Sequence, residues 1–320
     1  MSAPDPDPAP LLRVDALSVA FGHHRAVDRI SFAVAAGETL GLVGESGCGK
    51  STTAMALMRL LHGATVEGAA HLAGTDVMAL DEAGMRALRG PTVAMIFQDP
   101  ATALHPMIRV GDQVAEALRA QLGLGAAAAR ARAVELFRKV GIAAPEQRLR
   151  AYPHEMSGGM CQRVMIAMAI ACSPRLLLAD EPTTALDVTV QAQILDLLRD
   201  IAREAGMGLV LITHDLGVVA GMTDRVAVMY AGAIVETAAT DRLFADPRHP
   251  YTRGLLRSIP RLDGGWDEDM PTIPGSPSGA QRIEGCRFAP RCPLAAEVCR
   301  REPPLAEVGP GHRAACWMAA

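Results

Sequence analysis

The chain is poor in aromatic side chains: of its 320 residues, only 3% are Phe, Trp or Tyr. Surface on which unpaired bases could stack is therefore scarce, which argues against binding of single-stranded nucleic acid. An excess of positive charge is also lacking, because the formal net charge is -4 at pH 7, whereas binding to a phosphate backbone draws on a dense positive field. We therefore expect no nucleic-acid partner.

Long hydrophobic runs are missing as well. The best stretch, 164–172, has less than half of the roughly 20 apolar residues needed to cross a bilayer, so we do not expect the chain itself to span a membrane. Residues 1–10 alternate Pro with Asp and Ala and lack the basic and apolar regions of a secretory signal. We interpret them as a disordered tail of a cytosolic protein, in which the seven cysteines are reduced thiols or metal ligands.

The composition that is present, 50% hydrophobic and 21% charged, is typical of a globular protein. Its length suits one sizeable domain with an appendage. Apolar patterns predict an all-helical segment over 107–173, and they predict strands at 11–21, 26–34, 39–43, 92–97, 175–179, 208–213 and 225–230. Strands that alternate with helices indicate an α/β fold with a mainly parallel sheet covered on both faces.

A glycine-rich loop follows the strand expected at 39–43, and a helix is expected directly after the loop, at 51–61. The loop has the Walker A spacing of Gly, four residues, Gly, Lys and Ser. Backbone amides of such a loop surround phosphates, and the helix dipole favours their negative charge. A chance glycine-rich turn is the alternative. We predict that the following residues bind ATP, with Lys50 on the terminal phosphates, Ser51 on Mg²⁺ and Cys48 contributing only its backbone: Gly44, Glu45, Ser46, Gly47, Cys48, Gly49, Lys50, Ser51 and Thr52.

Polar side chains follow three of the other expected strands. Asp180 and Glu181 end the apolar run of the Walker B pattern, where Asp180 is placed to hold Mg²⁺ and Glu181 to polarise the attacking water. His214 follows the next strand and is predicted to contact the γ-phosphate and that water; a structural histidine is the alternative. Gln98 ends the strand before the helical segment and is predicted to touch the metal site.

Phe21, 23 positions before Gly44, is the aromatic residue expected to stack on adenine. The alternative is an ordinary core phenylalanine, because one aromatic at a strand end is weak evidence alone.

Residues Ser157-Gly158-Gly159-Met160-Cys161-Gln162-Arg163, followed by a helix, resemble the signature sequence of ABC ATPases. Met156 and Met160 replace the usual Leu and Gln, a variant familiar from peptide importers. The resemblance implies that two such domains face head to tail, and that each signature caps the γ-phosphate bound by the Walker A loop of the other. Ser157, Gly158, Gly159 and Gln162 would then contact the ATP of the partner subunit. In Ala185-Leu186-Asp187, which looks like the D-loop, Asp187 would line the interface.

The resemblance also implies a fold: a P-loop NTPase (RecA-like) core over 11–245 with an N-terminal antiparallel β subdomain and a helical signature subdomain at about 101–173. Within the family, the runs 247–252 and 285–293 look like the ATP-binding subunits of oligopeptide and dipeptide importers, a group that includes some nickel importers. Residues 246–320 would be the C-terminal extension of that group.

Such an importer implies a set of partners. They are a second ABC ATPase subunit, identical or different, two transmembrane permease subunits, and, indirectly, an extracytoplasmic solute-binding protein. The chain would lie peripherally at the cytoplasmic face of the inner membrane.

Four cysteines, Cys286, Cys292, Cys299 and Cys316, lie in a Pro- and Arg-rich segment that has too few apolar residues for a core of its own. Similar tails in peptide-importer ATPases bind a [4Fe–4S] cluster, and four cysteines suit that cluster as well as zinc. Iron–sulfur, zinc and no metal all stay open, because the spacing lacks a tight Cys-x-x-Cys pair.

The resemblance predicts ATP-driven import of peptides or related small solutes. One rival is a non-transport ABC ATPase acting on DNA or ribosomes, which predicts a coiled-coil insert or a second ATPase cassette; we find neither in this sequence. A second rival is a metal or redox sensor that uses ATP as its signal.

Overall fold

The computed structural model describes residues 9–184, 186–259, 272–277 and 279–319. The chain divides into two compact units. The first unit comprises Met1–Arg13, Ala33–Glu38 and His71–Val210, and the second unit comprises Val14–Phe32, Thr39–Ala70 and Leu211–Ala320. The tail expected at 1–10 and the Gly- and Pro-rich stretch after Leu262 lie largely outside the described residues.

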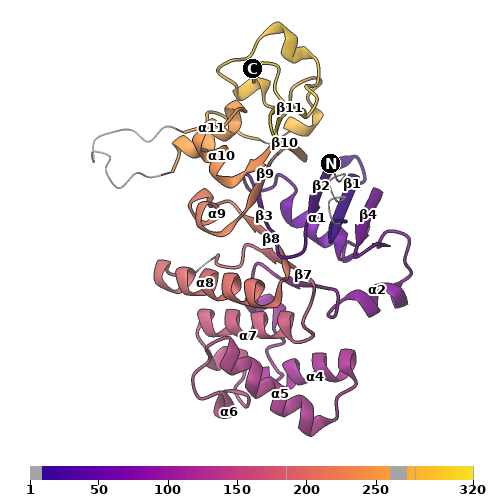
Figure 1. Ribbon diagram of the computed structural model, residues 1–320, viewed down its shortest axis with the longest axis vertical. Helices are drawn as coiled ribbons and strands as arrows, with labels where there is room; N and C mark the ends of the chain where they lie inside the picture. Colours follow the sequence, from indigo (N-terminus) through magenta and orange to yellow (C-terminus); the bar gives the residue numbers. More distant parts are fainter. Residues whose placement is uncertain (1–8, 185, 260–271, 278, 320) are drawn as a thin grey trace, which may run out of the picture. The chain divides into compact units, whose positions relative to one another are not determined.

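The first unit is mainly helical (Figure 1). Its helices are α2 (Glu82–Leu88), α3 (Pro100–Ala103), α4 (Val110–Leu122), α5 (Ala126–Lys139), α6 (Pro145–Arg148), η1 (Pro153–Glu155), α7 (Gly158–Ile170) and α8 (Val188–Ala205). In α4, Val110, Val114 and Leu118 recur every fourth residue and are fully buried, as expected for one face of a helix. Helices α4, α5 and α7 pack against one another, which confirms the all-helical segment predicted between the strands.

Two buried strands of the first unit run parallel to each other. In β6 (Val93–Ile96) and β7 (Leu176–Asp180), Val93 lies opposite Leu176 and Ile96 opposite Ala179. Every residue of both strands is buried, which explains why both read as continuous apolar runs. Because the strands are parallel, the residues that follow them emerge at the same edge of the sheet.

The second unit holds most of the strands. These are β1 (Leu12–Phe21), β2 (His24–Val34), β3 (Thr39–Val43), β4 (Thr65–Leu72), β9 (Arg225–Tyr230), β10 (Ala233–Ala239), β11 (Ala306–Gly309) and β12 (His312–Ala314). Strands β1, β2 and β4 form a sheet of order β2-β1-β4-β5, whose short last strand β5 (Thr75–Asp76) pairs antiparallel with the end of β4. Within this unit the second, larger sheet has the order β11-β12-β10-β9-β3. Strand β8 (Gly208–Thr213) has residues in both units.

Pairing in the larger sheet changes direction within the second unit. Strand β3 runs parallel to β9, with Leu42 opposite Ala227. Strand β10 turns back on β9 through Ala231 and Gly232, which both have positive φ, as a tight two-residue hairpin requires. Strand β12 then pairs antiparallel with β10, and β11 with β12. The sheet is therefore mixed rather than wholly parallel.

The C-terminal extension shares the core of the second unit. The helices of this unit are α1 (Lys50–Leu57), α9 (Leu216–Met222), α10 (Thr240–Ala245), α11 (Pro250–Arg257), η2 (Ala280–Arg282), η3 (Ala289–Arg291) and η4 (Glu297–Arg300). Tyr230, Tyr251 and Phe288 pack ring against ring, with centroids 4.7 to 5.4 Å apart. The described part of the extension therefore packs on shared apolar surface, which sequence reasoning did not predict.

A buried carboxylate ties the extension to the sheet. Glu236 of β10 is fully buried and accepts hydrogen bonds from the backbone amides of Arg248 (2.6 Å) and His249 (3.0 Å). Its Oε1 lies 2.7 Å from Nε2 of His312, which is also fully buried, in β12. Burial of a carboxylate is tolerated only when its oxygens are satisfied in this way.

Three predicted strands, 39–43, 208–213 and 225–230, are confirmed at those bounds. The helix predicted at 51–61 is shorter, because α1 ends at Leu57. Strands β4, β5, β10, β11 and β12 were not predicted. In β4 the first four residues are exposed, so no alternation of apolar and polar residues marks it.

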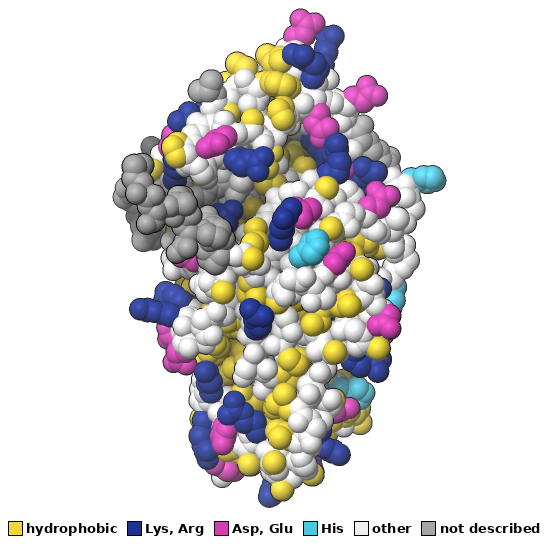
Figure 2. Space-filling view, turned by 45° about the vertical axis from the view of Figure 1, so that its right-hand side comes forward, with side chains coloured by type: hydrophobic (Ala, Val, Ile, Leu, Met, Phe, Trp, Pro, Cys, Tyr) yellow, Lys and Arg dark blue, Asp and Glu magenta, His cyan; other side chains and the backbone are white. Residues whose placement is uncertain are grey.

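Side chains of both charge signs are scattered over the face drawn in Figure 2, in keeping with the small net charge. Among the described residues, no helix combines the length and the apolar character that crossing a membrane requires.

Candidate functional site

The glycine-rich loop of the second unit connects β3 to α1, as predicted. Lys50, the first residue of α1, is buried, and its Nζ donates to the carbonyl oxygens of Gly44 (2.8 Å) and Glu45 (3.0 Å). Among the described residues no carboxylate forms an ion pair with Lys50. Its positive charge is therefore held on the loop by dipoles alone, which leaves it available to an anion such as phosphate.

Two loop glycines have no room for a side chain. Gly44 has φ 151° and Gly49 has φ 105°, a region that favours glycine. A Cβ on Gly44 would lie 2.2 Å from the carbonyl oxygen of Met229, and one on Gly49 would lie 2.5 Å from that of Ala26. The loop backbone is thus pressed against β9 and β2, which fixes the direction of its amides.

Glu45 of the loop contacts the C-terminal extension. Its backbone amide donates to the hydroxyl of Tyr251 (2.9 Å), and its two carboxylate oxygens accept from Nη1 (2.7 Å) and Nη2 (2.9 Å) of Arg291. Sequence reasoning assigned Glu45 to the loop but missed both partners. The available signal was a carboxylate inside a phosphate loop, which needs a neutralising cation to coexist with a polyphosphate.

In the first unit, Gln98 and Glu181 come together. They follow the parallel strands β6 and β7, and Nε2 of Gln98 donates to Oε2 of Glu181 (3.1 Å). The hydroxyl of Thr184 donates to the same oxygen (2.8 Å). Glu181 has φ 44°, a conformation that costs energy for a non-glycine residue and that clusters at functional sites. Asp180, the last residue of β7, is buried.

The predicted signature begins α7. Ser157 is the N-cap residue, and its hydroxyl accepts from the amide of Met160 (3.3 Å). Ser157 and Gly158 are exposed and Gly159 is half-buried, so this helix N-terminus presents backbone amides at the surface. Gln162 is instead buried, and its Nε2 has no hydrogen-bond partner among the described residues.

The remaining predicted site residues lie at strand and helix ends. Asp187 caps α8 by accepting from the amide of Val190 (3.0 Å), whereas Ala185 of the predicted D-loop lies outside the described residues. In the second unit, His214 is exposed directly after β8. Phe21 ends β1 with 38% of its surface exposed, so it is not an ordinary core residue.

The four cysteines of the extension are free thiols. Burial, together with the charges of Cys299 and Cys316, raises the pKa of Cys286. Burial likewise raises the pKa of Cys292 and Cys316, each with a contribution from Cys299. Backbone amides donate to two of the sulfurs, from Leu294 to Cys292 (3.4 Å) and from Met318 to Cys316 (3.3 Å). Among the described residues, however, no three His, Cys, Asp or Glu side chains are arranged to hold a metal ion.

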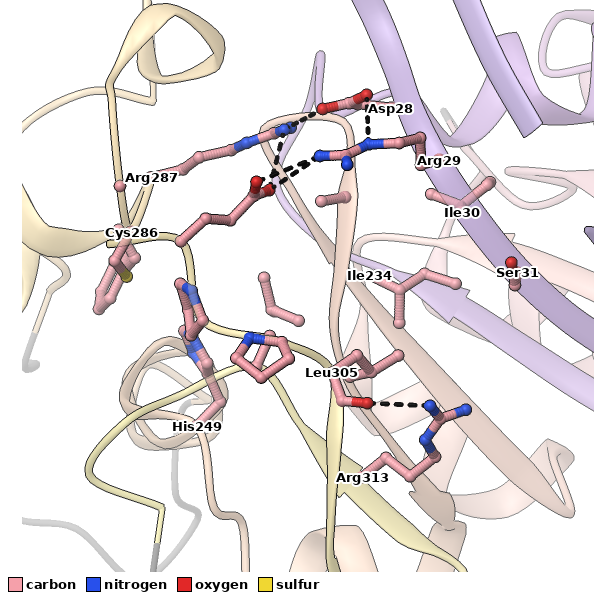
Figure 3. A pocket seen from close by; sticks show the side chains of 18 residues that line it. Asp28, Arg29, Ile30, Ser31, Ile234, His249, Cys286, Arg287, Leu305 and Arg313 are labelled. Atoms are coloured by element: carbon pink, nitrogen blue, oxygen red, sulfur yellow. Dashed lines mark hydrogen bonds and ion pairs between the residues drawn. The ribbon is translucent and has the colours of Figure 1, made fainter. Parts of the chain in front are cut away.

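A pocket of about 440 Å³ lies beside Cys286, between β2, β10 and the extension (Figure 3). Its rim carries an ion-pair network in which Asp28 contacts Arg287 and Arg29, and Arg29 contacts Glu302 (3.1 Å). Burial alone would raise the pKa of Asp28, but hydrogen bonds from Arg25 and Arg287 outweigh it and lower that pKa. The charges of Asp28, Arg29, Arg287 and Glu302 are therefore already paired with one another.

Comparison with known proteins gives two family matches. Residues 27–184 match the model described as ABC transporter, and residues 235–299 match the one described as oligopeptide/dipeptide transporter, C-terminal region. A probable peptide ABC transporter ATP-binding protein of Sinorhizobium fredii is 54% identical over 92% of this chain and 89% of its own length. The oligopeptide transport ATP-binding protein OppD of Salmonella typhimurium is 49% identical over 98% of this chain and 95% of its own.

Solved structures agree in fold. The dimeric ATP-binding cassette MJ0796, in a post-hydrolysis state with ADP and Pi, is 26% identical with a TM-score of 0.64 and covers 72% of this chain and 98% of its own. The cbiO1 protein of Clostridium perfringens, part of an ABC transporter complex, is 26% identical with a TM-score of 0.65 and covers 74% and 91%.

Proposed function

This chain belongs to the ATP-binding proteins of the ABC transporter family, in its oligopeptide/dipeptide branch, and from that premise we propose that it powers the import of peptides or related small solutes. It is an ATPase of the mixed α/β ABC fold. We infer that its working form is a dimer that closes over ATP, and the dimeric state of the cassette that it resembles supports this.

One observation carries the ATP-binding part of the proposal, namely the buried ammonium of Lys50 held on the glycine loop by two carbonyl oxygens. We assign to the loop, 44–52, the binding of the ATP phosphates, and to Phe21 stacking on adenine. Ser51, Gln98 and Asp180 offer oxygen ligands, the kind that Mg²⁺ prefers. When bound there, Mg²⁺ would neutralise charge on the phosphates.

Hydrolysis needs a group that orients and deprotonates water, and we assign this role to Glu181. Gln98 and Thr184 both donate to its Oε2, which fixes the direction of the carboxylate, and this carboxylate would accept the proton of the attacking water. The oxygen of that water forms a bond to the γ-phosphorus as the bond to the ADP oxygen breaks. We assign to His214 a contact with the γ-phosphate and this water.

The exposed amides at the start of α7 supply the second half of the proposed nucleotide site. Ser157, Gly158 and Gly159 would cap the γ-phosphate held by a partner subunit, with Asp187 lining the interface. Gln162 can join them only after a rearrangement, because its side chain is buried. The other proposed partners are two transmembrane permeases at the cytoplasmic face of the inner membrane and, through them, an extracytoplasmic solute-binding protein.

We also propose that the four tail cysteines hold a metal, with [4Fe–4S] favoured over zinc. The donor chemistry supports this proposal, since the four cysteines are free thiols and backbone amides donate to the sulfurs of Cys292 and Cys316. Such N–H···S bonds tune the reduction potential of iron–sulfur clusters. In this proposal the thiols lose their protons on binding and draw closer together.

The variant Glu181→Gln tests the proposed function. We expect it to bind ATP and form ATP-dependent dimers, while turnover falls at least about 100-fold because the general base is lost. In cells that lack the chromosomal copy, the wild-type chain should restore uptake of labelled di- and tripeptides, and Glu181→Gln should not. Wild-type turnover in this variant would remove Glu181 from its role. Uptake that stays normal without any copy of the chain would contradict peptide import.

A further inference from the structure

Three groups of Glu45 are each held by a different side chain. Its carbonyl oxygen accepts from Nζ of Lys50, its amide donates to the hydroxyl of Tyr251, and its carboxylate is gripped by both terminal nitrogens of Arg291. Lys50 belongs to the loop itself. Tyr251 and Arg291 belong to α11 and η3 of the C-terminal extension. The extension thus fixes the loop residue on which the phosphate-binding lysine rests.

The two partners from the extension are themselves firmly placed. Tyr251 is fully buried, and its ring packs against those of Tyr230 and Phe288. The side chain of Arg291 is 5% exposed, and its Nε donates to the carbonyl oxygen of Pro274 (2.8 Å). The hydrogen bonds that Arg291 donates to the Glu45 carboxylate raise the pKa of Arg291 above its usual range, so the guanidinium stays charged. Few rotamers are open to either side chain.

Charge gives the ion pair a second consequence. A carboxylate next to a triphosphate would repel it, and the repulsion is strong where water is partly excluded, as at Glu45, whose side chain is 26% exposed. A bidentate arginine neutralises that carboxylate and also fixes its direction. The loop therefore presents Lys50 to the phosphates without the opposing field of Glu45.

We propose that Arg291 and Tyr251 are positioning residues of the phosphate loop, through which the C-terminal extension sets the affinity of the chain for ATP. The inference rests on the proposed ATP site. It adds a role for the extension in nucleotide binding that does not depend on a metal at the cysteines. Neither residue touches the nucleotide; both act through Glu45.

The experiment is a double-mutant cycle on the purified full-length chain. The affinity for ATP is measured by calorimetry for the wild type, Arg291→Ala, Glu45→Ala and the double variant. Arg291→Ala leaves the Glu45 carboxylate unpaired, so we expect the Kd for ATP to rise about 10-fold. Glu45→Ala removes the carboxylate that would repel ATP and that Arg291 binds. The double variant should therefore recover most of the ATP affinity that Arg291→Ala loses. A purely structural role of Arg291 predicts no such rescue.

Two further variants complete the test. Arg291→Lys keeps the charge but not the bidentate geometry, and it should fall between the wild type and Arg291→Ala. Arg313→Ala is the matched control, because it removes an extension arginine whose side chain, among the described residues, donates to the carbonyl oxygen of Leu305 (2.9 Å) and forms no ion pair. Its ATP affinity should equal that of the wild type. Thermal melts of each variant without nucleotide separate unfolding from weakened binding.

The results separate this inference from the proposed function. A wild-type chain that binds no ATP would overturn both. A wild type that binds ATP, combined with an Arg291→Ala variant within about 2-fold of it, would overturn the inference alone. A double variant no better than folded Arg291→Ala would do the same.

Discussion

Acid should destabilise the second unit through His249. The imidazole is buried, and its Nδ1 accepts from the amide of Tyr251 (3.0 Å) as the N-cap of α11. Burial lowers the pKa of His249 from 6.5 to about 4, although a hydrogen bond with the backbone of Ala315 works in the opposite direction. Between these two pH values the unfolded chain binds a proton that the folded chain does not. The free energy of unfolding therefore falls as the pH drops below 6.5, and it stops falling below about pH 4, where the folded chain also binds the proton.

The size of the effect follows from the two pKa values of His249. Linkage between protonation and folding lowers the free energy of unfolding by only about 0.2 kcal/mol at about pH 7, by about 2 kcal/mol at about pH 5, and by about 3 kcal/mol at about pH 4, relative to alkaline pH. Losses of this size are a substantial part of the stability of an ordinary domain. Because His249 precedes the helix that carries Tyr251, the loss should also loosen the tie between α11 and the phosphate loop.

The assay is urea unfolding of the wild type and of His249→Asn across this pH range. Asparagine can still cap α11 but cannot titrate. In a Trp266→Phe background, Trp317 is the only tryptophan, and its Nε1 donates to the carbonyl oxygen of Arg301 (2.9 Å), so its fluorescence reports on the extension. The difference between wild type and variant should change by about 2 kcal/mol between about pH 7 and about pH 5. A difference that stays constant would refute a buried, neutral His249.

Two further predictions concern the signature and the cysteines. In Gly158→Asp the new Cβ meets only Leu186 among the described residues, at 3.8 Å, and an acid in the first turn of a helix is stabilising, so the fold should persist. ATP-dependent dimerisation and turnover should fall at least about 10-fold, because the new charge would face the γ-phosphate bound by the partner subunit. If the Gly158→Asp dimer is as tight as the Gly158→Asn dimer, the proposed cap is contradicted. Protein purified without oxygen should contain iron and acid-labile sulfide, and both should be lost in Cys299→Ser. Zinc in place of iron would favour the zinc alternative. Absence of both metals would refute the proposal of a metal at these cysteines.

The phosphate loop could be predicted from the sequence because its determinants are local. Gly44, Gly49 and Lys50 lie within seven consecutive positions, and the strand and helix around them show clear patterns. The positions of the two carboxylates at the end of β7, Asp180 and Glu181, could be predicted for the same reason: a buried run of apolar residues ends in two acids. Spacing alone was sufficient to place these residues at strand and helix ends, and the chemistry that we assign to them remains a proposal.

The contacts of the extension could not be predicted in this way. Arg291 and Glu45 are 246 positions apart, and no local pattern marks them as a pair. Strand β12 has only three residues, too few for a periodicity to appear. Its place beside β10 depends on Glu236, a buried acid in a strand that reads as weakly apolar. The four cysteines of this segment suggest a metal site, and no sequence pattern indicates that Phe288 packs against Tyr230 and Tyr251.

The pairing of β12 with β10 has a consequence for biosynthesis. A ribosome releases β10 long before it releases His312, and until then Glu236 lacks the imidazole that shares its burial. In a nascent or prematurely terminated chain, Glu236 would thus lack its histidine partner and β10 would be an unpaired edge strand. Proteases and chaperones can recognise such an exposed edge. We therefore expect Glu236 to gain its imidazole partner only after His312 has been synthesised.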